Sequence, residues 1–214
     1  MRTHHGSEPH AVVQWYSTPE SRSVFQRYAR WHQRLLPYFM MLAEEAARTG
    51  TPTCRPIWWG SEERTDLYQI DTEMLVGPNL LLAPILEAAK SERTVTFPPG
   101  RWARWSDFDL PLEAPITINQ ETISASESEA IVFVGAGAAL PLLTEDYQSM
   151  APPQDGIARP GIHTAPRVLS SLGFLLTPGG SSTGSLQNES FGMTSWRWDA
   201  ESSSALSTSG ARVN

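Results

Sequence analysis

The chain has 214 residues, of which 40% are apolar, and a formal net charge of −7. This length and apolar fraction predict one or two globular domains. The negative charge and the small number of Lys residues argue against a nucleic-acid partner, because surfaces that bind phosphate backbones cluster Lys and Arg. No stretch approaches the roughly 20 apolar residues that span a bilayer, and the N-terminus lacks the charged-then-apolar order of a secretory signal. We therefore expect a soluble protein without membrane contacts, with the cytoplasm favoured as its compartment.

The first ten residues are polar and carry three potential metal ligands. His4 and His5 are adjacent on an extended segment and point to opposite sides, so they cannot both face one ion, while His10 lies across a Pro-containing loop. The single cysteine, Cys54, excludes an internal disulfide and a Cys-based zinc site, and we expect an inert, partly buried thiol. No metal or cofactor is predicted.

A long helix is predicted to follow. Thr18 can cap its N-terminus, Pro19 suits its first position, and Gly50 suits its C-terminal end. Pro37 removes a backbone hydrogen bond and should kink the helix near residues 33–36. Apolar residues at steps of three and four form one face that needs a partner: Val24, Tyr28, Trp31, Leu35, Phe39, Leu42 and Ala46.

The next segment predicts a return to a sheet. Residues 51–59 have the β-branched and aromatic content of a strand, and residues 67–74 suggest a short helical turn. Turn residues at 77–79 separate two apolar runs, of which residues 80–86 read as a strand covered on both faces. Pro84 should close this strand, because proline cannot donate to a sheet ladder.

Short strands separated by Pro and Gly turns follow. Residues 91–97 and 101–105 are predicted to form a hairpin around the reversal at residues 98–100. Residues 116–118 and 131–134 predict two more strands, the second of them interior because it is continuously apolar. Short strands at these intervals favour a β-sandwich.

The character of the chain changes again after Ser149, where Pro, Ser and Gly become frequent. Residues 168–176 form one more apolar run, and residues 191–198 suggest another strand. Residues 201–214 are rich in Ser and are predicted to be disordered.

Several short motifs, taken in order, resemble the C-terminal part of glycoside hydrolase family 31, which contains α-glucosidases, α-xylosidases and sulfoquinovosidases. Each motif is weak alone, but their order and spacing make chance agreement improbable. The matching residues are MRTH at 1–4, RLLPY at 34–38, RTG at 48–50, RP at 55–56, LVGPNLLLAP at 75–84, PPGRW at 98–102 and VFVGAG at 132–137.

The resemblance implies an α/β segment followed by an all-β region. Residues 1–50 would be the last strand and helix of a (β/α)8 catalytic barrel, and residues 51–144 a proximal β-sandwich. Residues 145–200 would be part of a distal β region, with residues 201–214 as the tail. Active sites of such barrels lie at the C-terminal ends of the strands. The motif histidine of the family hydrogen-bonds hydroxyls of the sugar, which implies a substrate-binding role for His4.

The chemistry of the family limits what this chain can do. A retaining glycosidase needs two carboxyl groups about 5 Å apart, one as nucleophile and one as acid. The family carries both on earlier barrel strands, and Asp66, Asp71, Asp107 and Asp109 occur in neither motif. We therefore expect the C-terminal portion of a retaining α-glycosidase, with a glycoside as substrate, no catalytic residue of its own and no activity alone.

The sequence departs from the family pattern in three places. DTEM at 71–74 stands where relatives often have two acidic residues, a glutamine and an aromatic residue, and Gly135 stands where Arg is common. His5 follows the motif histidine where sulfoquinovosidase-like members carry Glu, although the RTHxG spelling resembles that subgroup.

The main alternative is a non-catalytic carbohydrate-binding β-sandwich. Such a module would stack exposed Trp58, Trp59, Trp102 or Trp105 on sugar rings and would bind oligosaccharides saturably. A protein-interaction domain unrelated to sugars has no positive feature in its favour. Neither the particular glycoside nor the oligomeric state follows from these residues.

Overall fold

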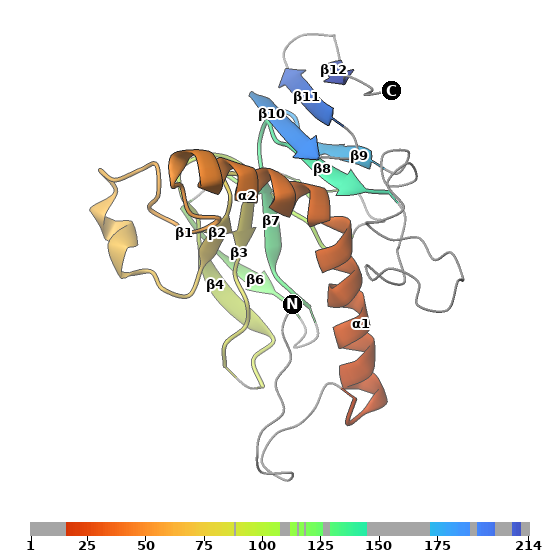
Figure 1. Ribbon diagram of the computed structural model, residues 1–214. Coiled ribbons are helices and arrows are strands. Elements are labelled where there is room, and N and C mark those ends of the chain that lie inside the picture. Colours follow the sequence, from red (N-terminus) through yellow and green to blue (C-terminus); the bar gives the residue numbers. More distant parts are fainter. Residues whose placement is uncertain are drawn as a thin grey trace. The chain divides into compact units, whose positions relative to one another are not determined.

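Figure 1 shows the computed structural model of the chain. It describes residues 16–87, 89–107, 112–114, 116–117, 119–125, 129–144, 172–188, 192–199 and 207–210. The chain divides into two compact units, Met1–Leu36 with Leu142–Gly173 and Pro37–Pro141 with Phe174–Asn214. His4, His5, His10 and most of the distal segment lie outside the described residues, so the predictions made for them stay predictions.

The predicted long helix is two helices, α1 (Pro19–Arg34) and α2 (Leu36–Thr49). Thr18 caps α1, because its side-chain oxygen accepts a hydrogen bond from the Ser21 N–H at 3.1 Å while the Ser21 hydroxyl oxygen accepts one from the Thr18 N–H. The break at Leu35 lies inside the stretch where a kink was predicted. Pro37 has no N–H to donate to the carbonyl four residues earlier, so the helix cannot continue unbroken.

The apolar face of α2 differs from the predicted one. Tyr38 is fully buried and Leu42 is 1% exposed, whereas Phe39 is only half-buried. The break at Leu35 interrupts the 3.6-residue repeat, so the phase counted along α1 does not carry into α2. Tyr38 and Leu42 are also buried by this chain's own strands, so this part of the face needs no outside partner.

The central sheet has five antiparallel strands in the order β1-β2-β3-β7-β5. Its strands are β1 (Cys54–Pro56), β2 (Met74–Val76), β3 (Leu80–Leu82), β7 (Val132–Gly135) and β5 (Trp102–Arg104). As predicted, the turn at Gly77 links two apolar strands, β3 stops before Pro84, and β7 is an interior strand. Cys54 is exposed, which corrects the expectation of a partly buried thiol: β1 is an edge strand and this side chain faces outward.

The predicted hairpin at residues 91–105 is wrong. Strand β4 (Glu92–Thr96) pairs instead with β6 (Gln120–Ser124), whereas β5 pairs with β7 in the other sheet. Pro98 and Pro99 have no N–H groups, so the chain leaves the β4 ladder there, and the Trp102 indole N–H donates to the Pro98 carbonyl at 3.1 Å. The strand predicted at residues 116–118 is reduced to one bridge between Trp102 and Ile116.

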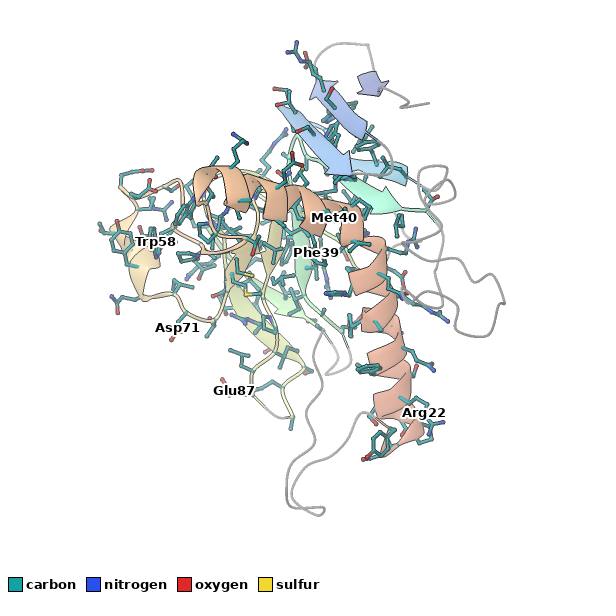
Figure 2. The ribbon with its side chains drawn as sticks, in the orientation of Figure 1. Arg22, Phe39, Met40, Trp58, Asp71 and Glu87 are labelled. Carbon is teal, nitrogen blue, oxygen red and sulfur yellow. The ribbon has the colours of Figure 1, made fainter. Side chains whose placement is uncertain are left out.

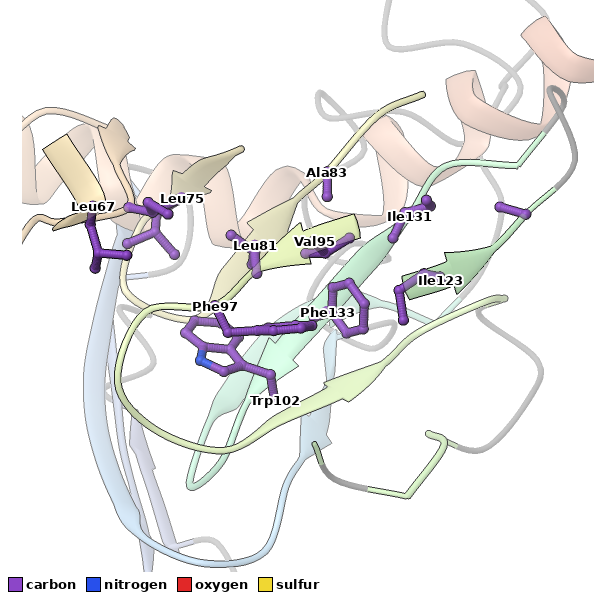
Figure 3. Close-up of a cluster of buried hydrophobic side chains, with 12 residues drawn as sticks. Leu67, Leu75, Leu81, Ala83, Val95, Phe97, Trp102, Ile123, Ile131 and Phe133 are labelled. Atoms are coloured by element: carbon purple, nitrogen blue, oxygen red, sulfur yellow. The ribbon is translucent and has the colours of Figure 1, made fainter. Parts of the chain in front are cut away.

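One hydrophobic cluster fills the space between strands of both sheets (Figure 3). Phe97, which follows β4, meets Phe133 of β7 edge to face, with ring centroids 4.9 Å apart. Burial of each side chain of this size stabilises the folded state by roughly 1.5–3 kcal/mol. The buried members are Ile57, Leu67, Leu75, Leu81, Ala83, Val95, Phe97, Trp102, Ile123, Ala125, Ile131 and Phe133.

A short 3-10 helix, η1 (Thr65–Gln69), overlaps only the first three residues of the helical turn predicted at residues 67–74, and Met74 instead begins β2. Strands β8 (Ala139–Leu143) and β9 (Leu172–Leu176) form a two-stranded sheet. None of the helices among the described residues has the length and apolarity needed to cross a membrane.

The last sheet has three antiparallel strands, β10 (Ser181–Asn188), β11 (Gly192–Asp199) and β12 (Ser207–Gly210), in that order. Strand β11 matches the strand predicted near residues 191–198. Within residues 201–214, predicted to be disordered, the described residues 207–210 form β12, which pairs with β11, and the prediction for the rest of this tail stays a prediction. Low apolar content did not prevent this pairing, because the ladder is built from the backbone.

The buried Tyr38 hydroxyl should make stability depend on alkaline pH. Burial raises the pKa of this phenol above its usual value of about 10. The folded state therefore keeps the proton at pH values where the unfolded chain releases it, so this contribution is fully present below pH ~10 and is lost as the pH rises further. Replacing Tyr38 by Phe leaves the Val76 carbonyl without its hydroxyl partner and should cost about 1–3 kcal/mol at neutral pH.

Urea unfolding of the natural chain and of Tyr38→Phe, at neutral and alkaline pH, measures this effect. The stability difference between them should shrink as the pH rises above ~10. Tyr68→Phe, at a tyrosine that is 46% exposed, is the matched control. A Tyr38→Phe difference that stays constant with pH contradicts the assignment.

Candidate functional site

The structure gives no evidence for an acid pair among the carboxylates considered above. Asp66 lies on the surface, where both of its oxygens accept hydrogen bonds from Arg64, at 2.8 and 2.7 Å. The hydrogen bond from Arg64 lowers the pKa of Asp66. Asp71 is exposed (Figure 2), Asp107 is half-buried, and Asp109 lies outside the described residues. An exposed Asp held ionised by Arg is unsuited to the work of a general acid at neutral pH.

Glu73 and Arg93 form a buried ion pair that sequence reasoning missed. Their side chains are 2% and 14% exposed, and Arg93 Nη2 donates to Glu73 Oε1 at 2.5 Å. The same carboxylate oxygen accepts from the Thr96 backbone N–H, while Glu73 Oε2 accepts from the Thr72 hydroxyl. Arg93 also donates to the Pro84 carbonyl. Because every partner comes from the β2, β3 or β4 region, this network is a structural clamp between strands.

A second ion pair attaches α2 to β1. Arg55 is 7% exposed, and its Nη2 donates to Glu45 Oε2 at 2.8 Å. Its Nε donates to the Pro52 carbonyl at 2.8 Å. This pair, like the clamp at Glu73, contributes to packing, although the Glu45 side chain remains 34% exposed.

The tryptophans considered for sugar stacking fall into two groups. Trp102 and Trp105 are 5% and 1% exposed, so neither can present a ring face to a ligand. Trp59 is 37% exposed and stacks beside the half-buried Trp58, with ring centroids 6.2 Å apart. Tyr68 of η1, 46% exposed, lies 5.2 Å from Trp58 between ring centroids. Buried Ile57 and Leu67 anchor this aromatic cluster of Trp58, Trp59 and Tyr68 to the core.

The predicted substrate-binding residue, His4, lies outside the described residues, so its role stays a prediction. Among the residues that the structure does describe, no group of three or more His, Cys, Asp or Glu side chains is arranged to hold a metal ion.

Comparison with known proteins gives the class of the β-rich region. Residues 50–140 match the sequence profile of the Glycosyl hydrolase family 31 C-terminal domain. The chain is 31% identical over 136 residues, 64% of its length, to an alpha-glucosidase of Saccharolobus solfataricus. That match covers 18% of the alpha-glucosidase, so the chain spans less than a fifth of this relative.

Solved structures agree with this assignment. A family 31 sulfoquinovosidase from E. rectale is 29% identical to the chain, with a TM-score of 0.58, over 64% of this chain and 20% of its own. A family 31 dextranase from Flavobacterium johnsoniae matches 86% of this chain and 22% of its own with a TM-score of 0.66, and at 20% identity this likeness shows the fold alone.

The region built around the five-stranded sheet therefore matches the β-rich C-terminal domain of glycoside hydrolases. The family that residues 50–140 match is glycoside hydrolase family 31. The resemblance found in the sequence motifs is confirmed.

The clamp at Glu73 gives a test of the packing of this domain. Arg93→Ala leaves a buried carboxylate without its cation and should destabilise the chain by about 3–5 kcal/mol. Arg64→Ala removes the partner of an exposed Asp and should leave the urea midpoint nearly unchanged. Equal midpoints for Arg93→Ala and the natural chain would show that the pair does not hold β4 in place.

Proposed function

We propose that this chain is the C-terminal portion of a retaining α-glycosidase that hydrolyses O-glycosyl bonds. The observation that carries the proposal is the match of residues 50–140 to the family 31 C-terminal domain. In this proposal, residues 51–144 are the proximal β-sandwich, which the shared core between the two sheets supports. Residues 1–50 are the last strand and helix of a (β/α)8 barrel, and the two helices at residues 19–49 support this part.

The substrate class in this proposal is an α-glycoside. The matched relatives include enzymes named alpha-glucosidase and sulfoquinovosidase, which share glycoside chemistry and differ in the sugar. His4, in the RTH motif, is proposed to hydrogen-bond hydroxyls of the bound sugar. The sugar preference is proposed to depend on residues outside this sequence.

The two catalytic carboxyl groups are proposed to come from residues outside this sequence. The carboxylates at Glu73 and Glu45 are each engaged by an arginine in the packing, and Asp66 is held by Arg64 on the surface. None of the three offers a free pair of the kind that retaining hydrolysis requires. The 214-residue chain alone is then a non-hydrolysing domain of the enzyme.

The purified chain should release no nitrophenol from an aryl α-glucoside above the rate of the buffer. His4→Ala is the matched variant, because His4 is the one residue of this chain assigned to the sugar. Turnover that is measurable and that His4→Ala abolishes would contradict the proposal, since the chemistry would then reside in this chain.

A second candidate function is a non-catalytic carbohydrate-binding module. The exposed rings of Trp59 and Tyr68 favour it, because sugar rings stack their apolar faces on aromatic side chains. This function needs no barrel and no acid pair. Trp102 and Trp105 have no part in it, since both are buried.

The variant Trp59→Ala distinguishes a carbohydrate-binding module from the C-terminal portion of an enzyme. If the aromatic cluster is a sugar site, the variant should weaken binding of maltotriose by roughly tenfold or more, as loss of a stacking aromatic anchor does. Thr94→Val, at an exposed threonine of β4, is the control and leaves the aromatic cluster intact. Equal affinities of Trp59→Ala and the natural chain, measured by calorimetry, rule the module out.

A further inference from the structure

A polar cleft of about 840 Å³ lies beside the last turns of α2. Its walls come from α2, from the turn before β3 and from strands β10 and β11, all within the unit Pro37–Pro141 with Phe174–Asn214. The volume is within the range of roughly 300–1,000 Å³ that small-molecule sites occupy. Figure 1 shows α2 and the β10–β11 pair that bound it.

The lining is rich in hydroxyl and amide groups. Strand β10 contributes five consecutive residues, 181–185, although alternate residues of a strand point to opposite faces. The cleft therefore reaches the edge of β10 in addition to the face that β10 shares with β11, whose residues 195–197 also line it. This edge pairs with no other strand among those that the structure describes, because β10 ends the order β10-β11-β12. Backbone N–H and C=O groups at such an edge are available to a ligand.

One hydroxyl in this wall lacks a partner. The Ser182 Oγ is shielded from solvent and has no hydrogen-bond partner among the described residues. A buried hydroxyl normally has a partner, because leaving it unpaired costs free energy. A rotation of the Ser182 side chain that turns Oγ into the cleft would give it a ligand hydroxyl as partner.

The wall behind these hydroxyls is rigid. Gly184 lies opposite Trp196 in the β10–β11 register, and a Cβ at Gly184 would come within 2.6 Å of the Trp196 ring. The indole therefore lies across Gly184, and Trp196 is 4% exposed. Its edge-to-face contact with Phe174, at 5.2 Å between centroids, holds the ring in place.

The charges around the cleft are balanced. Glu44, Glu45 and Arg48 of α2 and Arg197 of β11 all line the cleft, and Glu45 is already engaged by Arg55. A site for a phosphate or a carboxylate would show an excess of Arg or Lys. Balanced charges with many hydroxyls suit a neutral ligand that both donates and accepts hydrogen bonds.

We propose that this cleft binds a neutral oligosaccharide of two or three sugar units. The ligand hydroxyls exchange hydrogen bonds with the β10 edge, with Ser182 and with Asn79 at the β2–β3 turn. This site needs no catalytic group and goes beyond the proposed hydrolytic function, so either can fail without the other.

Calorimetric titration of the 214-residue chain with maltotriose tests the proposal. We expect saturable binding that the double variant Ser182→Ala/Thr183→Val weakens by roughly fivefold or more, since each lost hydrogen bond costs about three- to tenfold. Both substitutions remove a hydroxyl with little change in volume. Thr94→Val, at an exposed threonine of β4, is the matched control and should bind as the natural chain does.

Ser185→Trp, which fills the cleft, should abolish binding, and thermal unfolding of each variant shows whether it is folded. Two outcomes overturn the proposal: absence of saturable heat with the natural chain, or affinities that the cleft variants leave unchanged. Binding that Trp59→Ala abolishes and the double variant spares also overturns it and assigns the sugar to the aromatic cluster. If the cleft proves not to bind sugar, the proposed hydrolytic function is unaffected, because that function is tested separately by turnover.

Discussion

Much of this structure depends on the contact between Tyr38 of α2 and the β2–β3 turn. The Tyr38 hydroxyl donates to the Val76 carbonyl at 2.8 Å and accepts from the Asn79 N–H at 3.4 Å. Gly77 permits this approach, because its φ of +60° is costly for other residues and a Cβ there would come within 2.5 Å of the Leu42 side chain. The contact fixes α2 against the central hairpin and so positions the helix that lines the polar cleft.

The parts of the fold that could be predicted are those set by neighbouring residues. The cap at Thr18, the break before Pro37, the turn at Gly77 and the end of β3 before Pro84 each follow from the chemistry of one or two side chains. The β-rich region and its family could be predicted from the order of short motifs.

The errors arise where the outcome depends on distant residues. The sequence predicts that β4 pairs with β5, the next strand along the chain. Its actual partner is β6, because side chains from both sheets fill the shared core. Whether Tyr38 or Phe39 is buried depends on where the helix breaks. The ion pair between Glu73 and Arg93 joins residues 20 positions apart in the sequence. The polar cleft could not be foreseen, because its hydroxyls belong to a Ser-rich strand with little apolar signal.

The proposed function divides the work within one enzyme: the β-rich portion would support and bind, and the acids that cleave the bond would lie elsewhere in the protein. Mass spectrometry of the protein isolated from its source with an antibody against this chain tests that claim most directly. The account predicts α-glycosidase activity in a protein far larger than 23.6 kDa, with peptides that precede Met1. An active α-glycosidase whose intact mass is 23.6 kDa would contradict it.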